Sequence, residues 1–456
     1  MSLLQPKIGL RSASLLVVSV IVGSGVFKKI APMAAELGSP WLVLLCWIVA
    51  GLITLAGALT TAEMASLFPD SGGEYQYYRK VYNPFFAFLY GWGNFTVMKT
   101  ASIAALAYVF AESFYSIFAL KLQPYSIEAP ILIKAIATLL VASLTYVNFK
   151  GLTIAEKLSN SLTFLMFLAV GIFVIWGLFS PKGSWQNLSH TSSLEIYQNR
   201  TSGSWIKALF AACLGTFWGY EGWNHIGFIG EEVKSPQKNL PLALTFGTLA
   251  VILIYVSLNL VYLRVLPIEA FIQINDNPNT IAAIEVAKVI MEPIGTILLA
   301  CLILLTTLNA TNGTILMSAR LFYAMGRDKL FFTQTAHIHP NYQTPSFALL
   351  FQALWSVLLI WSGSFDQLTD MLVFASFIYY GATAYGVVLF RQKEPTLERV
   401  YKVVGYPYIP IVFILFCLVL VTVTLFTQPV QAFSGLALIA SGIPFYFYWQ
   451  KKESKN

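Results

Sequence analysis

The chain has 456 residues, of which 57% are hydrophobic and only 11% are charged, and its formal net charge is +7. A soluble domain carries about a quarter charged residues, so the composition argues against a water-soluble globular protein, a nucleic-acid-binding module and a disordered chain. The apolar residues fall in runs of about 20, the length that crosses a hydrocarbon layer about 30 Å thick. We therefore expect an all-α integral membrane protein.

Twelve apolar segments follow one another along the chain, and turn residues such as Gly38-Ser39-Pro40 and Ser71-Gly72-Gly73 separate them. Some exceed the length of a perpendicular span, so we expect those helices to be tilted or to extend beyond the bilayer. The expected spans are approximately 12–35, 40–67, 84–118, 130–149, 156–179, 205–230, 241–264, 292–325, 345–362, 367–390, 406–427 and 431–450.

The orientation follows from the basic residues of the loops, because cytoplasmic loops are enriched in Lys and Arg. An even number of spans puts both termini on one side, where 17 basic residues lie, against five on the other. We expect both termini in the cytoplasm and a multi-pass protein of the plasma (inner) membrane. The 17 are Lys7, Arg11, Arg79, Lys80, Lys150, Lys157, Lys234, Lys238, Arg327, Lys329, Arg391, Lys393, Arg399, Lys402, Lys451, Lys452 and Lys455; the five are Lys121, Lys182, Arg200, Arg264 and Lys288.

Two glycine clusters interrupt spans at their middle. Gly23-Ser24-Gly25 lies in the first span and Gly219-Tyr220-Glu221-Gly222 in the sixth. A broken helix survives in lipid only where it lines a cavity. Spans 1 and 6 begin two successive groups of five, and paired interruptions at matching positions are typical of an inverted-repeat transporter with a site at the midplane. Ordinary glycine packing between spans is the alternative.

Such interruptions can hold both ends of an α-amino acid without a charged side chain. A half-helix that begins after a break exposes N–H groups and a partial positive charge, and one that ends before a break exposes carbonyl oxygens. We expect Ser24 and Gly25 to donate to a substrate carboxylate. We expect the carbonyls of Ile21, Trp218 and Glu221 to accept from the substrate amine.

Ordered motifs recur from about residue 8 to about residue 345. They are Gly23-Ser24-Gly25-Val26-Phe27, Ala62-Glu63-Met64, Pro69-Asp70-Ser71-Gly72-Gly73-Glu74-Tyr75, Gly222-Trp223-Asn224, Glu231-Glu232-Val233 and Asn239-Leu240-Pro241. Together they resemble the amino acid–polyamine–organocation superfamily. The Gly-Trp-Asn triplet and the basic Lys99 in span 3 are most similar to the L-type amino-acid transporters.

The resemblance implies a single transporter domain with a five-plus-five inverted repeat of the LeuT type, in which helices 1 and 6 are unwound at mid-span. The repeats would cover about 12–179 and 205–390, with two extra helices over about 406–450. It also implies alternating access and an L-amino-acid substrate. In this family an aromatic residue at the position of Trp218 is a gate over the substrate, and Asn224 matches a residue that holds the broken helix 6 in shape. Gly23 and Tyr220 complete the expected substrate site.

The sequence departs from the L-type pattern in three places. The lysine that relatives carry in span 5, at the position of a sodium ion, falls at Thr163. Either a sodium ion bound by hydroxyls of Thr163 and of Thr306, Thr307 and Thr311 takes its place, or the site is empty, so exchange, sodium symport and proton symport all stay open. Glu221 replaces a small or apolar residue. The loop between spans 3 and 4 lacks the cysteine that joins a heavy subunit, so we expect no disulfide-linked partner and a microbial source.

Lys99 and Glu221 both lie near mid-span, where a charge costs about 2.5–3.5 kcal/mol or more. We expect both to face the interior. Two hypotheses stay open. In one, Glu221 interacts with a cationic group, which is Lys99, the substrate amine or a proton, and so affects coupling. In the other, Lys99 and Glu221 form a static ion pair. A polyamine or cationic amino-acid antiporter is the alternative within the class. A membrane sensor or a membrane-bound enzyme is the alternative outside it, although the four histidines form no catalytic or metal cluster and we expect no cofactor.

Overall fold

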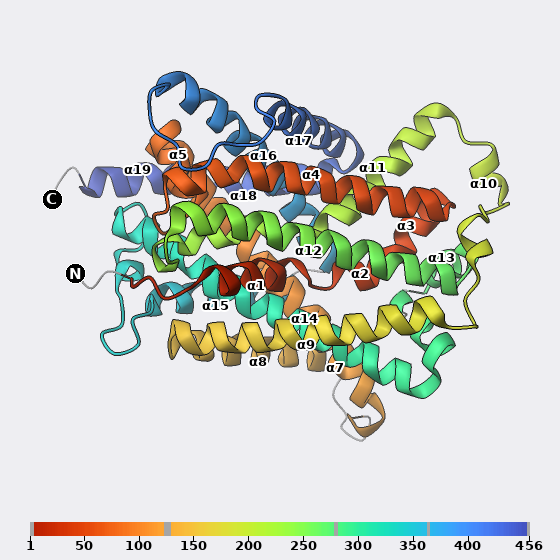
Figure 1. Cartoon of the computed structure of the whole chain (residues 1–456). Helices are drawn as coiled ribbons and strands as arrows, with labels where there is room; N and C mark the ends of the chain where they lie inside the picture. Colours follow the sequence, from red (N-terminus) through yellow and green to blue (C-terminus); the bar gives the residue numbers. More distant parts are fainter. Residues whose placement is uncertain (1–3, 123–128, 278–280, 363–364, 454–456) are drawn as a thin grey trace.

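The computed structural model describes residues 4–122, 129–277, 281–362 and 365–453. Apart from one bridge between Ile8 and Val233, the described chain is built from helices packed side by side (Figure 1). Both termini lie at the same end of the bundle, which we call the terminal end; α3, α10 and α13 lie at the opposite end (Figure 1). The side chain of Lys121 and the loop residues 123–128 are outside the described part, so the expected absence of a partner cysteine there rests on the sequence alone.

The helices follow the apolar segments of the sequence closely. Their bounds are α1 Leu10–Ile21, α2 Gly25–Lys28, α3 Ile30–Leu37, α4 Pro40–Leu67, α5 Glu74–Val81, α6 Pro84–Gly93, the π-helical η1 Asn94–Met98, α7 Lys99–Leu122, α8 Ala129–Phe149, α9 Leu152–Phe179, η2 Trp185–Leu188, α10 Glu195–Gln198, α11 Ser202–Gly219, η3 Trp223–Glu232, α12 Pro236–Val265, α13 Ile268–Asn275, α14 Ala282–Arg327, η4 Thr333–Ala336, α15 Ser346–Ser362, α16 Phe365–Lys393, α17 Tyr408–Thr427, α18 Pro429–Ala440 and α19 Gly442–Glu453.

In the described ranges, ten helices are long and apolar enough to cross a membrane. The two expected spans outside this set correspond to α11, which ends after 18 residues at Gly219, and to α15, which has 17 residues. The expected span 292–325 begins where α14 bends, at the positive φ of Glu292. The chain is therefore a multi-pass, all-helical membrane protein.

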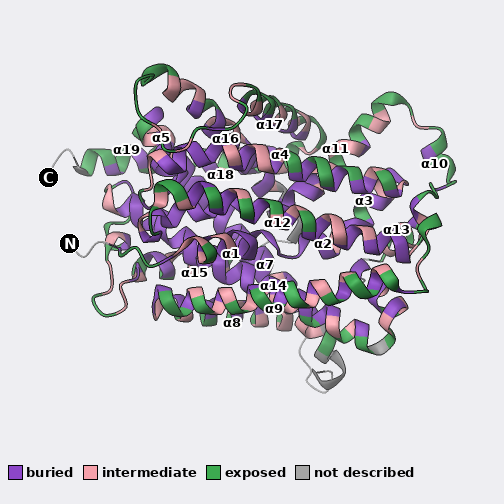
Figure 2. Ribbon diagram, in the orientation of Figure 1, coloured by how far each residue is buried: buried purple, intermediate pink, exposed green. Residues whose placement is uncertain are grey.

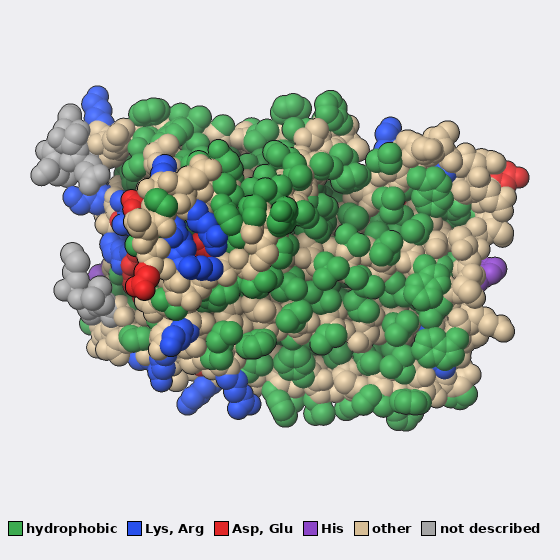
Figure 3. Space-filling view, turned by 45° about the horizontal axis from the view of Figure 1, so that its top comes forward, with side chains coloured by type: hydrophobic (Ala, Val, Ile, Leu, Met, Phe, Trp, Pro, Cys, Tyr) green, Lys and Arg blue, Asp and Glu red, His purple; other side chains and the backbone are tan. Residues whose placement is uncertain are grey.

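The outer surface supports this assignment. Leu139 on α8, Phe164 on α9 and Leu253 on α12 are each more than 60% exposed, whereas the helices at the centre, α1, α7 and α14, are largely buried (Figure 2). Hydrophobic side chains cover the face between the two ends, and Lys and Arg gather toward the terminal end (Figure 3). Lipid tails would cover such a band without exposing backbone polar groups, because helices satisfy their own.

Buried ion pairs hold the helices together at the terminal end. The Glu63 carboxylate on α4 accepts from Arg391 on α16 at 2.8 and 2.5 Å and from the backbone N–H of Val403 at 2.8 Å. Arg320 on α14 donates to both oxygens of Glu232 at 2.7 and 3.0 Å. Both carboxylates are about 1% exposed, so each lies in low dielectric where its pairing matters most.

We expect Glu63→Gln to destabilise the protein by about 3 kcal/mol, the lower end of the cost of breaking a buried ion pair, because Arg391 keeps some contact with water. Thermal unfolding of purified protein in detergent measures this change. Glu398→Gln is the matched control, since Glu398 is exposed and its replacement should leave the unfolding midpoint unchanged. An equal midpoint for Glu63→Gln and Glu398→Gln would contradict the structural role of Glu63.

Candidate functional site

The two helix interruptions lie against each other. Helix α1 ends at Ile21 and α2 begins at Gly25, while α11 ends at Gly219 and continues after Gly222 as the 3-10 helix η3. A Cβ atom on Gly25 would lie 2.5 Å from the Cα atom of Gly219, so only glycine permits this approach. Gly222 has φ +108°, which glycine adopts without strain, and a Cβ there would meet the carbonyl oxygen of Val20 at 3.1 Å.

A small cavity of about 10 Å³ lies at this junction, about the room of one water molecule. Of the residues expected at the site, Ile21, Gly23, Ser24, Gly25, Trp218 and Glu221 line it. Tyr220 and Asn224 do not line it. The hydroxyl of Tyr220 instead donates to the carbonyl of Trp47 at 3.1 Å. The lining residues that the sequence analysis missed are Val20, Ser102, Leu106 and His225.

Several polar groups at the cavity lack partners among the described residues. The Ser24 hydroxyl is buried and makes no hydrogen bond, and the backbone N–H groups of Ser24 and Gly25 make none. Both ring nitrogens of His225 are also buried without a hydrogen-bond partner. Buried polar groups are nearly always satisfied, so this concentration of unsatisfied donors indicates a place for a polar ligand.

Tyr255 on α12 connects the two interruptions. Its hydroxyl lies 2.8 Å from the carbonyl oxygen of Ile21 and 2.7 Å from that of Gly219. The single O–H of Tyr255 donates to one of these two carbonyls at a time. The Ile21 carbonyl also accepts from the N–H of Gly23 at 2.9 Å. In the described part of the chain, the carbonyls of Val20 and Glu221 accept no hydrogen bond.

Lys99 and Glu221 form a buried ion pair beside the cavity. The Lys99 ammonium donates to Oε1 of Glu221 at 2.9 Å, and the two side chains are 2% and 7% exposed. The hydroxyl of Tyr380 on α16 donates to Oε2 of Glu221 at 2.6 Å. Lys99 begins α7 directly after the π-helical η1, and π-bulges often lie at functional sites. Both carboxylate oxygens therefore have partners inside the protein.

The polar contacts continue from Glu221 toward the terminal end. The Tyr380 hydroxyl also lies 3.3 Å from Oδ1 of Asn224, and the Asn224 amide donates to Oε1 of Glu74 at 2.6 Å. Tyr90 on α6 donates to Oε2 of Glu74 at 3.3 Å. Asn224 thus hydrogen-bonds η3 to α5 and lies close to Tyr380 of α16; its role in holding the broken helix in shape stays a prediction. Glu74 belongs to the motif at residues 69–75, from which we predicted family membership but no role for this residue.

The coupling candidates are hydrogen-bonded largely within their own helices. Thr163 donates to the carbonyl of Ser159 and accepts from the side-chain amide of Asn309, each at 2.8 Å. The hydroxyls of Thr306 and Thr307 donate to the carbonyl of Ile303, and that of Thr311 donates to the carbonyl of Thr307. Among the described residues, no group of three or more His, Cys, Asp or Glu side chains converges as metal ligands.

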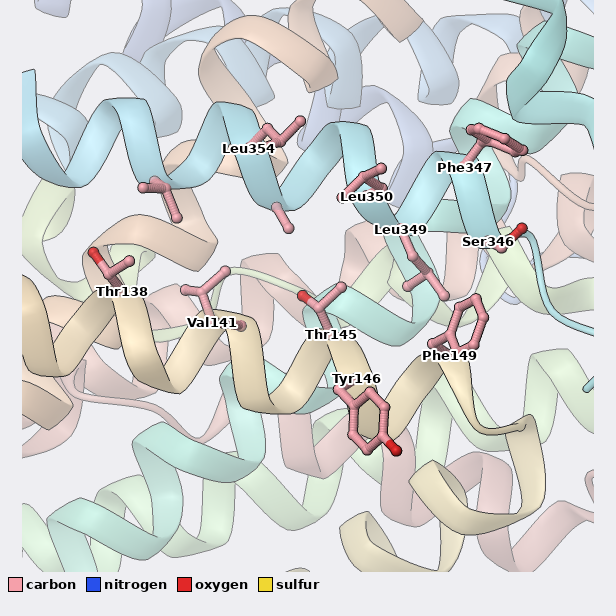
Figure 4. Close-up of a pocket in the computed structure, with 13 residues that line it drawn as sticks. Thr138, Val141, Thr145, Tyr146, Phe149, Ser346, Phe347, Leu349, Leu350 and Leu354 are labelled. Carbon is pink, nitrogen blue, oxygen red and sulfur yellow. The ribbon is translucent and has the colours of Figure 1, made fainter.

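A larger hollow of about 690 Å³ lies between α8 and α15, lined by side chains such as Thr138, Val141, Leu350 and Leu354 (Figure 4). Its lining is aliphatic, aromatic or hydroxyl-bearing and includes no charged residue. Leu354 is 57% exposed, so the groove opens at the apolar outer surface. It offers no charged or amide groups for an amino acid and is not the candidate site.

The chain matches the family described as "Amino acid permease" over residues 8–448. It is 28% identical to the "Serine/threonine exchanger SteT" of Bacillus subtilis, over 99% of this chain and 98% of that protein. It is 31% identical to the mouse "Large neutral amino acids transporter small subunit 2", over 98% and 82%, and 29% identical to the mouse "b(0,+)-type amino acid transporter 1", over 97% and 88%. These relatives are transporters and not enzymes. The chain therefore belongs to the amino acid permease family of the amino acid–polyamine–organocation superfamily and is an amino-acid transporter.

Proposed function

We propose that the protein exchanges small neutral L-amino acids across the plasma membrane by alternating access. The observation that carries this proposal is the junction of the two interruptions, where Ser24 presents a buried hydroxyl and backbone N–H group without partners among the described residues. The cavity of about 10 Å³ at this junction widens in our proposal to admit the amino acid. The exchanger named among the relatives supports antiport.

In this proposal the backbone holds the zwitterion. The substrate carboxylate accepts from the N–H groups of Ser24 and Gly25 and from the Ser24 hydroxyl. The substrate amine donates to the carbonyls of Val20 and Glu221, which accept no hydrogen bond from the described residues. Charge-assisted hydrogen bonds of this kind are stronger than neutral ones.

The surroundings of the cavity favour a small neutral side chain. Both oxygens of Glu221 already accept hydrogen bonds, from Lys99 and Tyr380, so no free carboxylate is available for a second positive charge. Ser102 and Leu106 of α7 restrict the space opposite the interruptions. A polyamine or cationic amino acid would need an unpaired buried carboxylate in the cavity, which makes the cationic antiporter the weaker alternative.

The architecture that we propose has twelve spans in a five-plus-five inverted repeat with two extra helices. The ten long apolar helices account for ten spans, and α11 with η3 and α15 supply the other two. Both termini would be cytoplasmic, because basic side chains gather at the terminal end (Figure 3). The name of one relative makes it a small subunit; we propose that this chain acts without a disulfide-linked heavy subunit, since the sequence has no cysteine between spans 3 and 4.

Trp218 is the proposed gate, since it lines the cavity at the last turn of α11, beside the α1–α2 interruption. We propose exchange without a sodium ion. The Thr163 hydroxyl already both donates and accepts a hydrogen bond, and the hydroxyls of Thr306, Thr307 and Thr311 donate to carbonyls of their own helix.

The function is tested by counterflow in proteoliposomes. Liposomes preloaded with unlabelled L-serine should take up labelled L-serine several-fold faster than empty ones, with or without sodium. L-Threonine and L-alanine should compete, whereas L-arginine and putrescine should not. Absence of amino-acid uptake under every ionic condition would overturn the function, sodium dependence would indicate symport, and preference for L-arginine would indicate the cationic antiporter.

We expect Gly25→Ala to weaken L-serine binding. The added methyl group would force α2 away from Gly219, and overpacking costs about 1–3 kcal/mol, equivalent to about 5- to 150-fold in affinity. Binding of labelled L-serine to purified protein measures the loss. Gly203→Ala on α11 is the control, because a Cβ there meets nothing within 4 Å. Equal affinities for the two variants would refute the proposed binding mode.

A double-mutant cycle separates a static Lys99–Glu221 pair from a coupling role. We expect Glu221→Gln alone to lower stability by about 3–5 kcal/mol, because Lys99 is left buried without a counter-charge. Lys99→Met combined with Glu221→Gln should recover most of that loss in thermal unfolding and keep the exchange of L-serine. Recovery of stability with loss of exchange would assign Glu221 to coupling instead.

A further inference from the structure

Glu74 is a buried carboxyl group outside the proposed substrate site. It is the first residue of α5, between the spans Pro40–Leu67 and Pro84–Tyr115, and it is 1% exposed. Its oxygens accept from the neutral amide of Asn224 at 2.6 Å and from the neutral hydroxyl of Tyr90 at 3.3 Å. Among the described residues, no Lys, Arg or His nitrogen lies within 4 Å of it.

The other buried carboxylates at the terminal end have arginine partners. Glu63 is paired with Arg391, and Glu232 with Arg320. An isolated buried carboxylate is far less stable than the protonated form, so such a group takes up a proton in preference to remaining charged.

The positive charge nearest in effect to Glu74 is already paired with another carboxylate. Among the described residues, Lys99 on α7 acts on Glu74, and its ammonium donates to Glu221. This shared charge compensates Glu74 only in part, which favours its protonated form. The other titratable groups around Glu74 are Tyr90 on α6, Tyr380 on α16, and Tyr77 and Tyr78 on α5 itself. His225 on η3 lies beside Glu221, with its Nε2 atom 3.8 Å from Oε1.

We propose that Glu74 is a proton-binding site that holds a proton while α5 is packed against η3 and releases it when the terminal end opens to water. This proposal rests on the proposed amino-acid exchange and identifies what regulates it. The contacts of Glu74 link it to the interruption of the sixth span. Its hydrogen-bond donor Asn224 follows Gly222, the last residue of that interruption, by two residues.

The packing of α5 on η3 explains why opening would change the proton affinity. The N–H of Gly72 donates to the carbonyl of Phe228 at 3.0 Å, and a Cβ on Gly73 would touch the side chain of Phe228 at 2.8 Å. Separation of the two elements would hydrate the carboxyl group. Burial raises the pKa of Glu74 to about 7 in the packed state, and hydration would return it toward the ordinary value of about 4.3.

The sign of the pH effect follows. The packed state binds more protons than the open state, so acid stabilises the packed state, and this advantage is lost as the pH rises through about 7. The ionised fraction of a group that titrates near 7 rises about tenfold between about pH 6 and about pH 8. Exchange that requires opening of the terminal end should accelerate by up to this factor over the same interval.

The test compares wild type with Glu74→Gln, Glu74→Asp, His225→Gln and the exposed control Glu398→Gln in proteoliposomes with equal pH on both sides. Exchange of L-serine is measured between about pH 5.5 and about pH 8.5, the window around the titration. Wild type, Glu74→Asp and Glu398→Gln should accelerate with pH, whereas Glu74→Gln should give a slow rate that does not change. A wild-type rate independent of pH, or a Glu74→Gln profile like that of wild type, overturns the proposal. A flat profile caused by His225→Gln alone also overturns it.

A second measurement does not depend on transport. The infrared spectrum of purified wild type should contain the C=O band of a protonated carboxyl that disappears as the pH rises through about 7 and that is absent from Glu74→Gln. Failure of L-serine to exchange, with this band present, would refute the proposed function and leave the proton site standing. Absence of a titrating band, with exchange intact, would refute the proton site alone.

Discussion

A backbone that leaves its helix inside a bilayer must find partners for the polar groups it exposes, and the rest of this structure depends on how that requirement is met. The hydroxyl of Tyr255 lies within hydrogen-bond distance of the carbonyls of both Ile21 and Gly219, so one side chain of α12 lies against the ends of both broken helices and donates to one of them at a time. In the described part of the chain, the N–H groups of Ser24 and Gly25 and the hydroxyl of Ser24 make no hydrogen bond. The junction thus presents open donors, and in our proposal these bind the substrate carboxylate.

The charged groups near the interruptions complement this arrangement. Lys99 and Glu221 neutralise each other, and Tyr380 takes the second oxygen of Glu221, so the cavity carries polar groups without a net charge. The same Tyr380 approaches Asn224, which reaches Glu74 on α5. Side chains in direct contact thus connect the cavity to the terminal end, which would give the proposed substrate site a physical route for coupling.

Hydropathy and glycine clusters were sufficient to predict where the helices lie and where two of them break, because lipid penalises any exposed backbone. The partners of the broken ends could not be predicted. Tyr255, Ser102 and Tyr380 stand in apolar runs where lipid-facing and inward-facing residues look alike, and their roles depend on the rotation of one helix against another. For this reason the contact of the Tyr255 hydroxyl with the Ile21 carbonyl, which we expected to accept from the substrate amine, could not be predicted. The helix type after Gly222 was also hidden, since no local motif separates a 3-10 from an α-helix.

The buried glutamates at the terminal end differ in whether they form an ion pair with an arginine. Glu63 and Glu232 are as deeply buried as Glu74, yet each forms an ion pair with an arginine that holds helices together. In the described part of the chain, the side-chain partners of Glu74 are a neutral amide and a neutral phenol, so we propose that its charge follows its exposure to water. Three carboxyl groups of equal burial thus differ in whether an arginine faces them. The sequence shows the glutamates, but only the three-dimensional neighbours show which of them can change charge as the protein moves.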